Sequence, residues 1–81
     1  MYKDEVDKIP KNIVGKNVEA IRKEKKLKQR ELVLMLKEKD FIISTSGLSK
    51  LEANRRKVTD KELVALAEVL EVSVEELLNL K

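Results

Sequence analysis

Residues 44–57 read STSGLSKLEANRRK, and this stretch decides how the surrounding chain folds. Leu48 and Leu51 stand three residues apart, as they would on the inward face of a helix. Ser44 or Thr45 is a suitable N-cap for that helix. Because three cations follow, the segment is either a solvated surface helix with a charged tail or a helix that enters a nucleic-acid groove.

Apolar residues recur at helical spacing along most of the sequence, which has only two glycines and one proline. This pattern predicts four further helices. They are residues 11–25, residues 29–38, a segment opened by a capping box of Thr59 and Glu62, and a segment opened by Ser73 and Glu76. We therefore expect an all-α fold of five short helices, with a single domain over residues 11–81 and a flexible arm at residues 1–10.

Two segments are less regular. Lys28 precedes the helix expected at residues 29–38, and an ammonium group cannot accept a hydrogen bond from a free amide, so this helix should begin weakly. Residues 40–43 interrupt the helical period, and either Phe41 or Ile43 should fill the core; a short strand is an alternative.

Asn54 tolerates the left-handed conformation that closes a helix, so the helix begun at Ser44 or Thr45 should end there.

The inventory of side chains argues against catalysis and metal binding. The sequence has no cysteine and no histidine, so it lacks thiolate ligands and the commonest general base. We expect no enzyme activity, no catalytic residue, no cofactor and no metal. The longest apolar runs, such as residues 32–36, have five residues or fewer, which predicts neither a signal peptide nor a membrane span. The lack of cysteine fits a reducing cytoplasm.

The net charge of +3 is unevenly distributed. Residues 1–10 carry two cations and three acids, residues 11–57 carry fourteen cations and six acids, and residues 58–81 carry two cations and six acids. A basic middle joined to an acidic end indicates one face for a polyanion and another that points away from it. Lysines that merely solubilise helices are the alternative.

Five segments carry the strongest signal through their order and spacing. They are residues 14–22 (VGKNVEAIR), 27–32 (LKQREL), 48–52 (LSKLE), 63–70 (LVALAEVL) and 72–78 (VSVEELL). Together they resemble the five-helix Cro/C1-type DNA-binding domain of phage repressors, which implies a compact lambda-repressor-like bundle containing a helix-turn-helix. The sequence departs from the usual pattern at Lys28, at Val33, and in a long connection from Leu36 to Leu48, which we interpret as a variant of the family.

The resemblance implies that the third helix lies in the major groove of double-stranded DNA. The base contacts it predicts are Thr45, Ser46, Ser49 and Lys50, with Lys50 suited to guanine O6 or N7. The backbone contacts it predicts are Gln29, Arg55, Arg56 and Lys57. For the hydroxyls the alternative is helix capping alone, and for the three cations it is a solvated charge run. The resemblance also implies a structural ion pair of Arg22 with Glu52 beneath this helix.

We therefore expect a sequence-specific transcriptional regulator in the cytoplasm, a repressor by family habit, which binds a two-fold operator as a homodimer, at least on DNA. The dimer contacts should come from the acidic fifth helix through Leu77, Leu78 and Leu80, although Val74, Leu77 and Leu78 could equally complete the monomer core. One alternative is an antitoxin-like or other protein-interaction module, with a protein partner at the fifth helix and with DNA binding secondary or lost. Another is a nonspecific nucleic-acid binder.

Overall fold

The computed structural model describes residues 10–79, so nearly all of the arm expected at residues 1–10 lies outside the described residues. The described residues form five helices and no strand, which confirms the all-α prediction. The helices are α2 (Gly15–Glu24), α3 (Gln29–Lys37), α4 (Thr45–Glu52), α5 (Asp60–Leu70) and α6 (Val74–Leu78).

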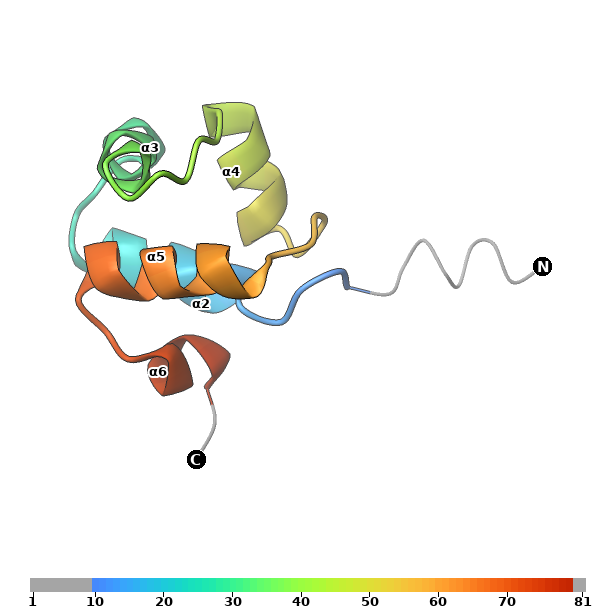
Figure 1. The fold of residues 1–81 in the computed structure, drawn as a ribbon. Coiled ribbons are helices and arrows are strands. Elements are labelled where there is room, and N and C mark those ends of the chain that lie inside the picture. The colour runs from blue at the N-terminus through green and yellow to red at the C-terminus, as the bar shows by residue number, and fades with distance from the viewer. Residues whose placement is uncertain (1–9, 80–81) are drawn as a thin grey trace.

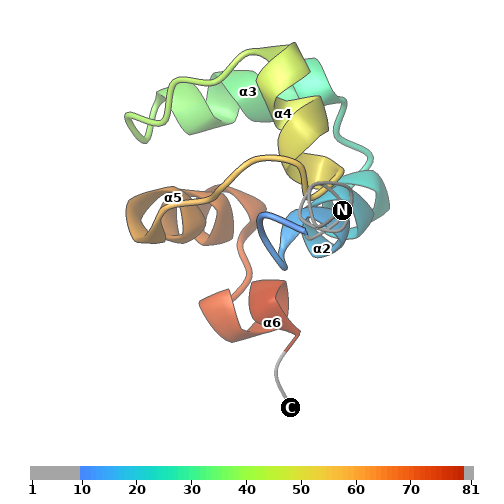
Figure 2. The same ribbon diagram turned by 90° about the vertical axis from the view of Figure 1, so that its right-hand side faces the viewer.

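The helices enclose one apolar core. In Figure 1, α2 and α5 lie across the middle of the molecule, with α3 and α4 above them and α6 below. A view from the side shows α4 crossing α3, with its C-terminal end near α2 (Figure 2). The fully buried apolar side chains come from all five helices: Val18, Leu32, Leu36, Leu48, Leu51, Leu66, Leu70 and Leu77. Burial of each such side chain contributes roughly 1.5–3 kcal/mol to the stability of the fold. Because Leu48 and Leu51 are among them, the core holds α4 against the other helices.

Side-chain caps set the starts of three helices where the sequence predicted them. Ser44 Oγ accepts a hydrogen bond from the Gly47 N–H at 3.0 Å, so Ser44 and not Thr45 caps α4. Both predicted capping boxes form, Thr59 with Glu62 and Ser73 with Glu76. Each cap satisfies backbone amides that a helix leaves without partners in its first turn.

Helix α3 begins at Gln29 even though Lys28 offers no acceptor. The Glu31 carboxylate accepts a hydrogen bond from the Lys28 N–H at 2.8 Å, and its negative charge lies in the first turn. A carboxylate at this place also interacts favourably with the positive end of the helix dipole. Glu31 thus compensates for part of the missing cap at Lys28.

The first helix begins later than predicted, at Gly15 and not at residue 11. Asn12 Oδ1 accepts hydrogen bonds from the Val14 and Gly15 N–H groups, at 3.0 and 2.7 Å. These bonds hold residues 12–14 in a turn before the helix, because a short amide side chain competes for the backbone donors that a helix would use.

Helix α2 approaches α4 closely at Gly15. A Cβ added to Gly15 would overlap with the backbone oxygen of Leu51 and with Oδ1 of Asn54. Asn54 adopts the left-handed conformation predicted for it, with φ of 62°. The absence of a side chain at Gly15 therefore allows the C-terminal turn of α4 to pack against α2.

Phe41 and Ile43, in the connection between α3 and α4, both pack in the core. Phe41 is buried, Ile43 is partly buried against the core, and Ile42 between them is 73% exposed. The sequence left Phe41 and Ile43 as alternatives because alternation over so few residues does not fix which side chains point inward. Among the described residues this connection is neither strand nor helix. Its backbone can therefore take the path that the packing of Phe41 and Ile43 requires.

The apolar side chains of α6 help complete the monomer core. Leu77 is fully buried, and Val74 and Leu78 are partly buried against the core. Asn17 Nδ2 donates a hydrogen bond to the backbone oxygen of Leu77 at 2.7 Å, which joins α6 to α2. Leu80, which we expected at a dimer surface, lies outside the described residues.

A buried ion pair joins α2 to α4, as the resemblance implied. Arg22 Nε and Nη2 donate to the two carboxylate oxygens of Glu52 at 2.7 and 3.1 Å, and Arg22 Nη1 donates to the backbone oxygen of Leu27 at 2.8 Å. Arg22 is 7% exposed and Glu52 is 2% exposed. The hydrogen bond to Glu52 raises the pKa of Arg22 above its ordinary value, although burial opposes the shift. Both charged groups therefore keep strong partners inside the protein.

Replacing Gly15 by alanine should destabilise the fold. We expect Gly15→Ala to lower the free energy of unfolding by about 1–3 kcal/mol, because α2 or α4 must shift to accommodate the methyl group. Urea denaturation measures the change. Lys16→Ala, at the exposed neighbouring position, is the matched control and should stay within about 0.5 kcal/mol of the parent. Equal stability of all three proteins would contradict the close α2–α4 packing.

Removing one partner of the buried ion pair should cost more than removing a surface charge. We expect Arg22→Met to lower the free energy of unfolding by about 3–5 kcal/mol, because it leaves the Glu52 carboxylate buried without its cation. The control is Lys23→Met, which removes an exposed ammonium 3.4 Å from Glu19 and should cost at most about 1 kcal/mol. The free energy of unfolding is measured by urea denaturation. Similar losses in the two variants would mean that the buried position of the Arg22–Glu52 pair adds nothing to its contribution to stability.

Candidate nucleic-acid interface

Helix α4 divides into an inward apolar side and an outward polar side. Leu48 and Leu51 are buried. The four residues predicted to contact bases are all exposed: Thr45, Ser46, Ser49 and Lys50. Because Ser44 caps the helix, the hydroxyls of the next two residues are not needed for that purpose. The outward side of α4 therefore presents short hydroxyls and one cation on a helix whose other side is fixed in the core.

Gln29 links the buried ion pair to the outward side of α4. Its Nε2 donates to Glu52 Oε1 at 3.0 Å, and its Oε1 accepts from Ser49 Oγ at 3.1 Å. The hydrogen bonds thus run without interruption from Arg22 in α2, through Glu52 and Gln29, to Ser49. We call these four residues the polar chain. The sequence did not reveal the contact between Gln29 and Ser49, because these residues are 20 positions apart and either could have faced water alone.

The three cations after α4 occupy different environments. Arg55 and Lys57 are exposed. Arg56 is partly buried, with its guanidinium 3.2 and 3.3 Å from the two carboxylate oxygens of Glu62 and 5.8 Å from the centroid of the Phe41 ring. A cation at this distance from an aromatic face is attracted by the ring. Arg56 therefore anchors the loop to the domain, while its two neighbours point into solvent.

Asn12 fixes the same loop from the other side, a role that the sequence did not reveal. Its Nδ2 donates to the backbone oxygens of Leu51 and Arg56, at 3.1 and 2.8 Å. The Lys11 N–H donates to the Asn54 oxygen at 2.9 Å. These bonds hold both ends of the turn between α4 and the basic residues. Asn12 fell inside the helix predicted over residues 11–25, and an asparagine there gives no sign of a distant backbone partner.

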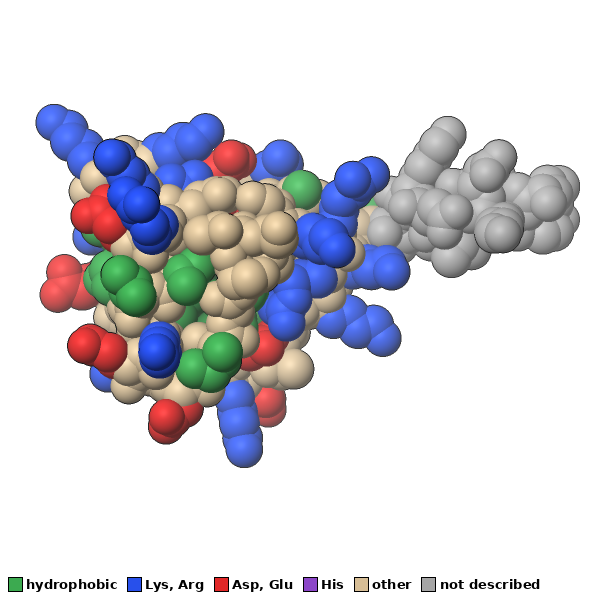
Figure 3. Space-filling model, turned by 90° about the horizontal axis from the view of Figure 1, so that it is seen from above, with side chains coloured by type: hydrophobic (Ala, Val, Ile, Leu, Met, Phe, Trp, Pro, Cys, Tyr) green, Lys and Arg blue, Asp and Glu red, His purple; other side chains and the backbone are tan. Residues whose placement is uncertain are grey.

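The outward side of α4 belongs to a larger polar and basic surface. Figure 3 looks down on the face that carries α3 and α4, where a central area without charged side chains is bordered by many lysine and arginine side chains. Short polar groups in the middle suit contacts with base edges, and cations at the border suit contacts with phosphates. Acidic and apolar side chains also stand at parts of the border, so the cations do not surround the central area completely (Figure 3).

Neither a metal-binding cluster nor a membrane-spanning helix is found in the part of the chain that the structure describes. In residues 10–79 there is no group of three or more acidic side chains placed to hold a metal ion. Within the same residues no helix has the length and apolar character needed to cross a membrane.

A comparison with protein families agrees with this geometry. The model of a helix-turn-helix family matches residues 18–77, which include all of α3, α4 and α5 and most of α2 and α6. No curated protein and no solved structure matches the chain. The family match covers most of the sequence, and α3 and α4 supply its two central helices. The chain belongs to the Cro/C1-type helix-turn-helix family, whose domains bind DNA in transcription regulation.

Proposed function

We propose that this protein is a sequence-specific transcriptional repressor that inserts α4 into the major groove of a two-fold operator. The observation that carries the proposal is the outward side of α4, where four exposed polar side chains stand on a helix fixed from beneath by the Arg22–Glu52 pair. A helix that must place side chains against base edges needs such a rigid base, because small misplacements would break the short hydrogen bonds of serine and threonine.

The proposed contacts fall into two groups. Thr45, Ser46, Ser49 and Lys50 contact base edges, and Lys50 has the reach for guanine O6 or N7. Gln29, Arg55, Arg56 and Lys57 contact the phosphate backbone. Gln29 lies in the first turn of α3, where free backbone amides and the helix dipole also favour an anion. Arg56 would have to share its guanidinium between a phosphate and Glu62, so its contribution should be smaller than that of Arg55.

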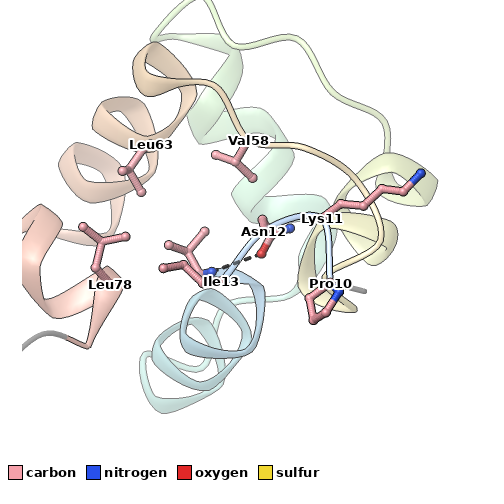
Figure 4. Close-up of a pocket in the computed structure, with 8 residues that line it drawn as sticks. Pro10, Lys11, Asn12, Ile13, Val58, Leu63 and Leu78 are labelled. Atoms are coloured by element: carbon pink, nitrogen blue, oxygen red, sulfur yellow. Dashed lines mark hydrogen bonds between the residues drawn. The ribbon is translucent and has the colours of Figure 1, made fainter. Parts of the chain in front are cut away.

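We propose that the protein binds its operator as a homodimer in the cytoplasm, through a surface that includes Leu78 of α6 and the apolar residues beside it. Leu77 already serves the monomer core. Nearby, a pocket of about 260 Å³ lies between residues 10–14 before α2, the loop before α5, α5 and α6. It is lined in part by Ile13, Val58, Leu63 and Leu78 (Figure 4). Ile13 is 69% exposed and adjoins this apolar lining, so the two together offer a surface that a second copy could cover.

The proposal can be tested with the DNA upstream of the protein's own gene. Binding of this duplex and of a scrambled duplex of equal length is measured over a salt series. We expect tighter binding to the upstream duplex at every salt concentration, with two protein chains per duplex and half-sites about 34–36 Å apart. Equal affinity for both duplexes at all salt concentrations would overturn sequence-specific regulation, and one chain per site would overturn the dimer.

Lys50 and Arg55 should separate sequence choice from affinity. We expect Lys50→Ala to reduce the preference for the operator by about 1–3 kcal/mol, because it removes a base contact. Arg55→Ala should weaken binding to all sequences alike and reduce the salt slope by about 0.9, the effect of one phosphate contact. Arg55 is the cleaner choice because Arg56 also stabilises the loop through Glu62. Equal loss of sequence preference in both variants would contradict the assignment.

A further inference from the structure

The polar chain has a fixed direction of hydrogen-bond donation. Arg22 can only donate, and it donates to both oxygens of Glu52. The Glu52 carboxylate, paired with this cation, can only accept. The side-chain group of Gln29 that lies 3.0 Å from Glu52 Oε1 must therefore be the amino group, since a carbonyl oxygen there would face another oxygen. The buried charge pair thus decides the orientation of the Gln29 amide.

The orientation of Gln29 in turn determines what the Ser49 hydroxyl can do. Gln29 directs its carbonyl oxygen at Ser49 Oγ, 3.1 Å away, and a carbonyl oxygen can only accept. The single hydroxyl proton of Ser49 is therefore used within the protein. What Ser49 presents to the outside is its lone pairs, so it is an acceptor and not the interchangeable donor or acceptor that a free serine would be.

We propose that Ser49 contacts a base through an amino group, which in the major groove means adenine N6 or cytosine N4. These are the only hydrogen-bond donors on the major-groove edges, whereas guanine N7 and O6, adenine N7 and thymine O4 are acceptors. An acceptor facing Ser49 would compete with Gln29 for one proton. The inference rests on the proposed binding of α4 in the major groove, and it makes Gln29 a positioning residue for Ser49.

Gln29 can meet a phosphate and direct Ser49 at the same time. Its amino group has two hydrogens, one of which is used by Glu52, and the other remains for a phosphate oxygen. The nearby Ser46 provides a contrast within the same helix. It is exposed, and among the described residues its hydroxyl has no hydrogen-bond partner in the protein, so it can donate or accept.

Single-atom changes in the DNA test the proposal. A preferred duplex is selected from a randomised pool, and variants of it each receive one analogue. Purine replaces adenine to remove N6, 2-pyrimidinone replaces cytosine to remove N4, and 7-deazapurines and 2-aminopurine remove the acceptors N7 and O6. We expect one amino deletion to weaken binding of the parent protein by about three- to tenfold, the effect of one hydrogen bond, and to have no such effect on Ser49→Ala. Comparing the two proteins cancels any weakening of the duplex itself.

Two variants serve as controls. Ser46→Ala should remain sensitive to the amino deletion that Ser49→Ala ignores. Gln29→Ala frees the Ser49 hydroxyl to donate as well as to accept. A base pair that presents an acceptor in place of the amino group should then bind this variant within about twofold of the selected duplex, whereas the parent protein should reject it by about three- to tenfold. The lost phosphate contact weakens all duplexes alike. A merely structural role for Gln29 would not change the choice between an amino group and an acceptor at a single position.

Three results would overturn the inference. Ser49→Ala could abolish the effect of an acceptor deletion, it could change the response to no analogue, or Gln29→Ala could reject a base pair with an acceptor at this position as strongly as the parent protein does. In each of these cases the selected duplex would still bind better than a scrambled one, so sequence-specific binding would stand. Equal binding of the selected and scrambled duplexes would instead mean that the proposed function itself has failed.

Discussion

The position of α4 depends on the ion pair between Arg22 and Glu52. Leucine packing alone would bury the inner side of α4, but apolar contacts are not directional and allow a helix to slide or rotate slightly. The guanidinium adds three hydrogen bonds with fixed directions, two to Glu52 and one to the backbone of Leu27. Because both groups are almost fully buried, an alternative position of α4 would leave charges without partners, and this penalty favours a single geometry.

The same pair connects stability with recognition through the polar chain. Glu52 belongs to the core by its burial, yet one of its oxygens also holds Gln29 at the surface of α3. Ser49 is exposed, yet its hydroxyl proton is directed by a group that is itself directed from the core. The exposed side of α4 is therefore not a set of independent side chains, because the hydrogen bonding of Ser49 depends on buried groups beneath it.

Most of the fold could be predicted because its signals are local. The Thr59–Glu62 and Ser73–Glu76 capping boxes, and the leucine spacing of α4, each involve residues within one helical turn. The start of α2 was predicted wrongly because the spacing of apolar residues does not show a local hydrogen bond. The Asn12 side chain accepts from the Val14 and Gly15 N–H groups, and this delays the start of the helix. The exposed side of α4 followed from periodicity. The links from Gln29 to Ser49 and from Arg56 to Glu62 did not, because a sequence shows which groups can pair and not which ones meet.

The ion pair of Arg56 has a consequence for the energy of complex formation. Glu62 Oε1 accepts hydrogen bonds both from Arg56 and from the Thr59 N–H at the start of α5. Arg56 is already paired with the Glu62 carboxylate. A phosphate that bound Arg56 would therefore replace Glu62 as its negative partner, and the arginine would gain less than an unpaired cation would. The carboxylate left behind would remain bound to the start of α5. An internal competitor of this kind moderates the attraction of Arg56 for any polyanion.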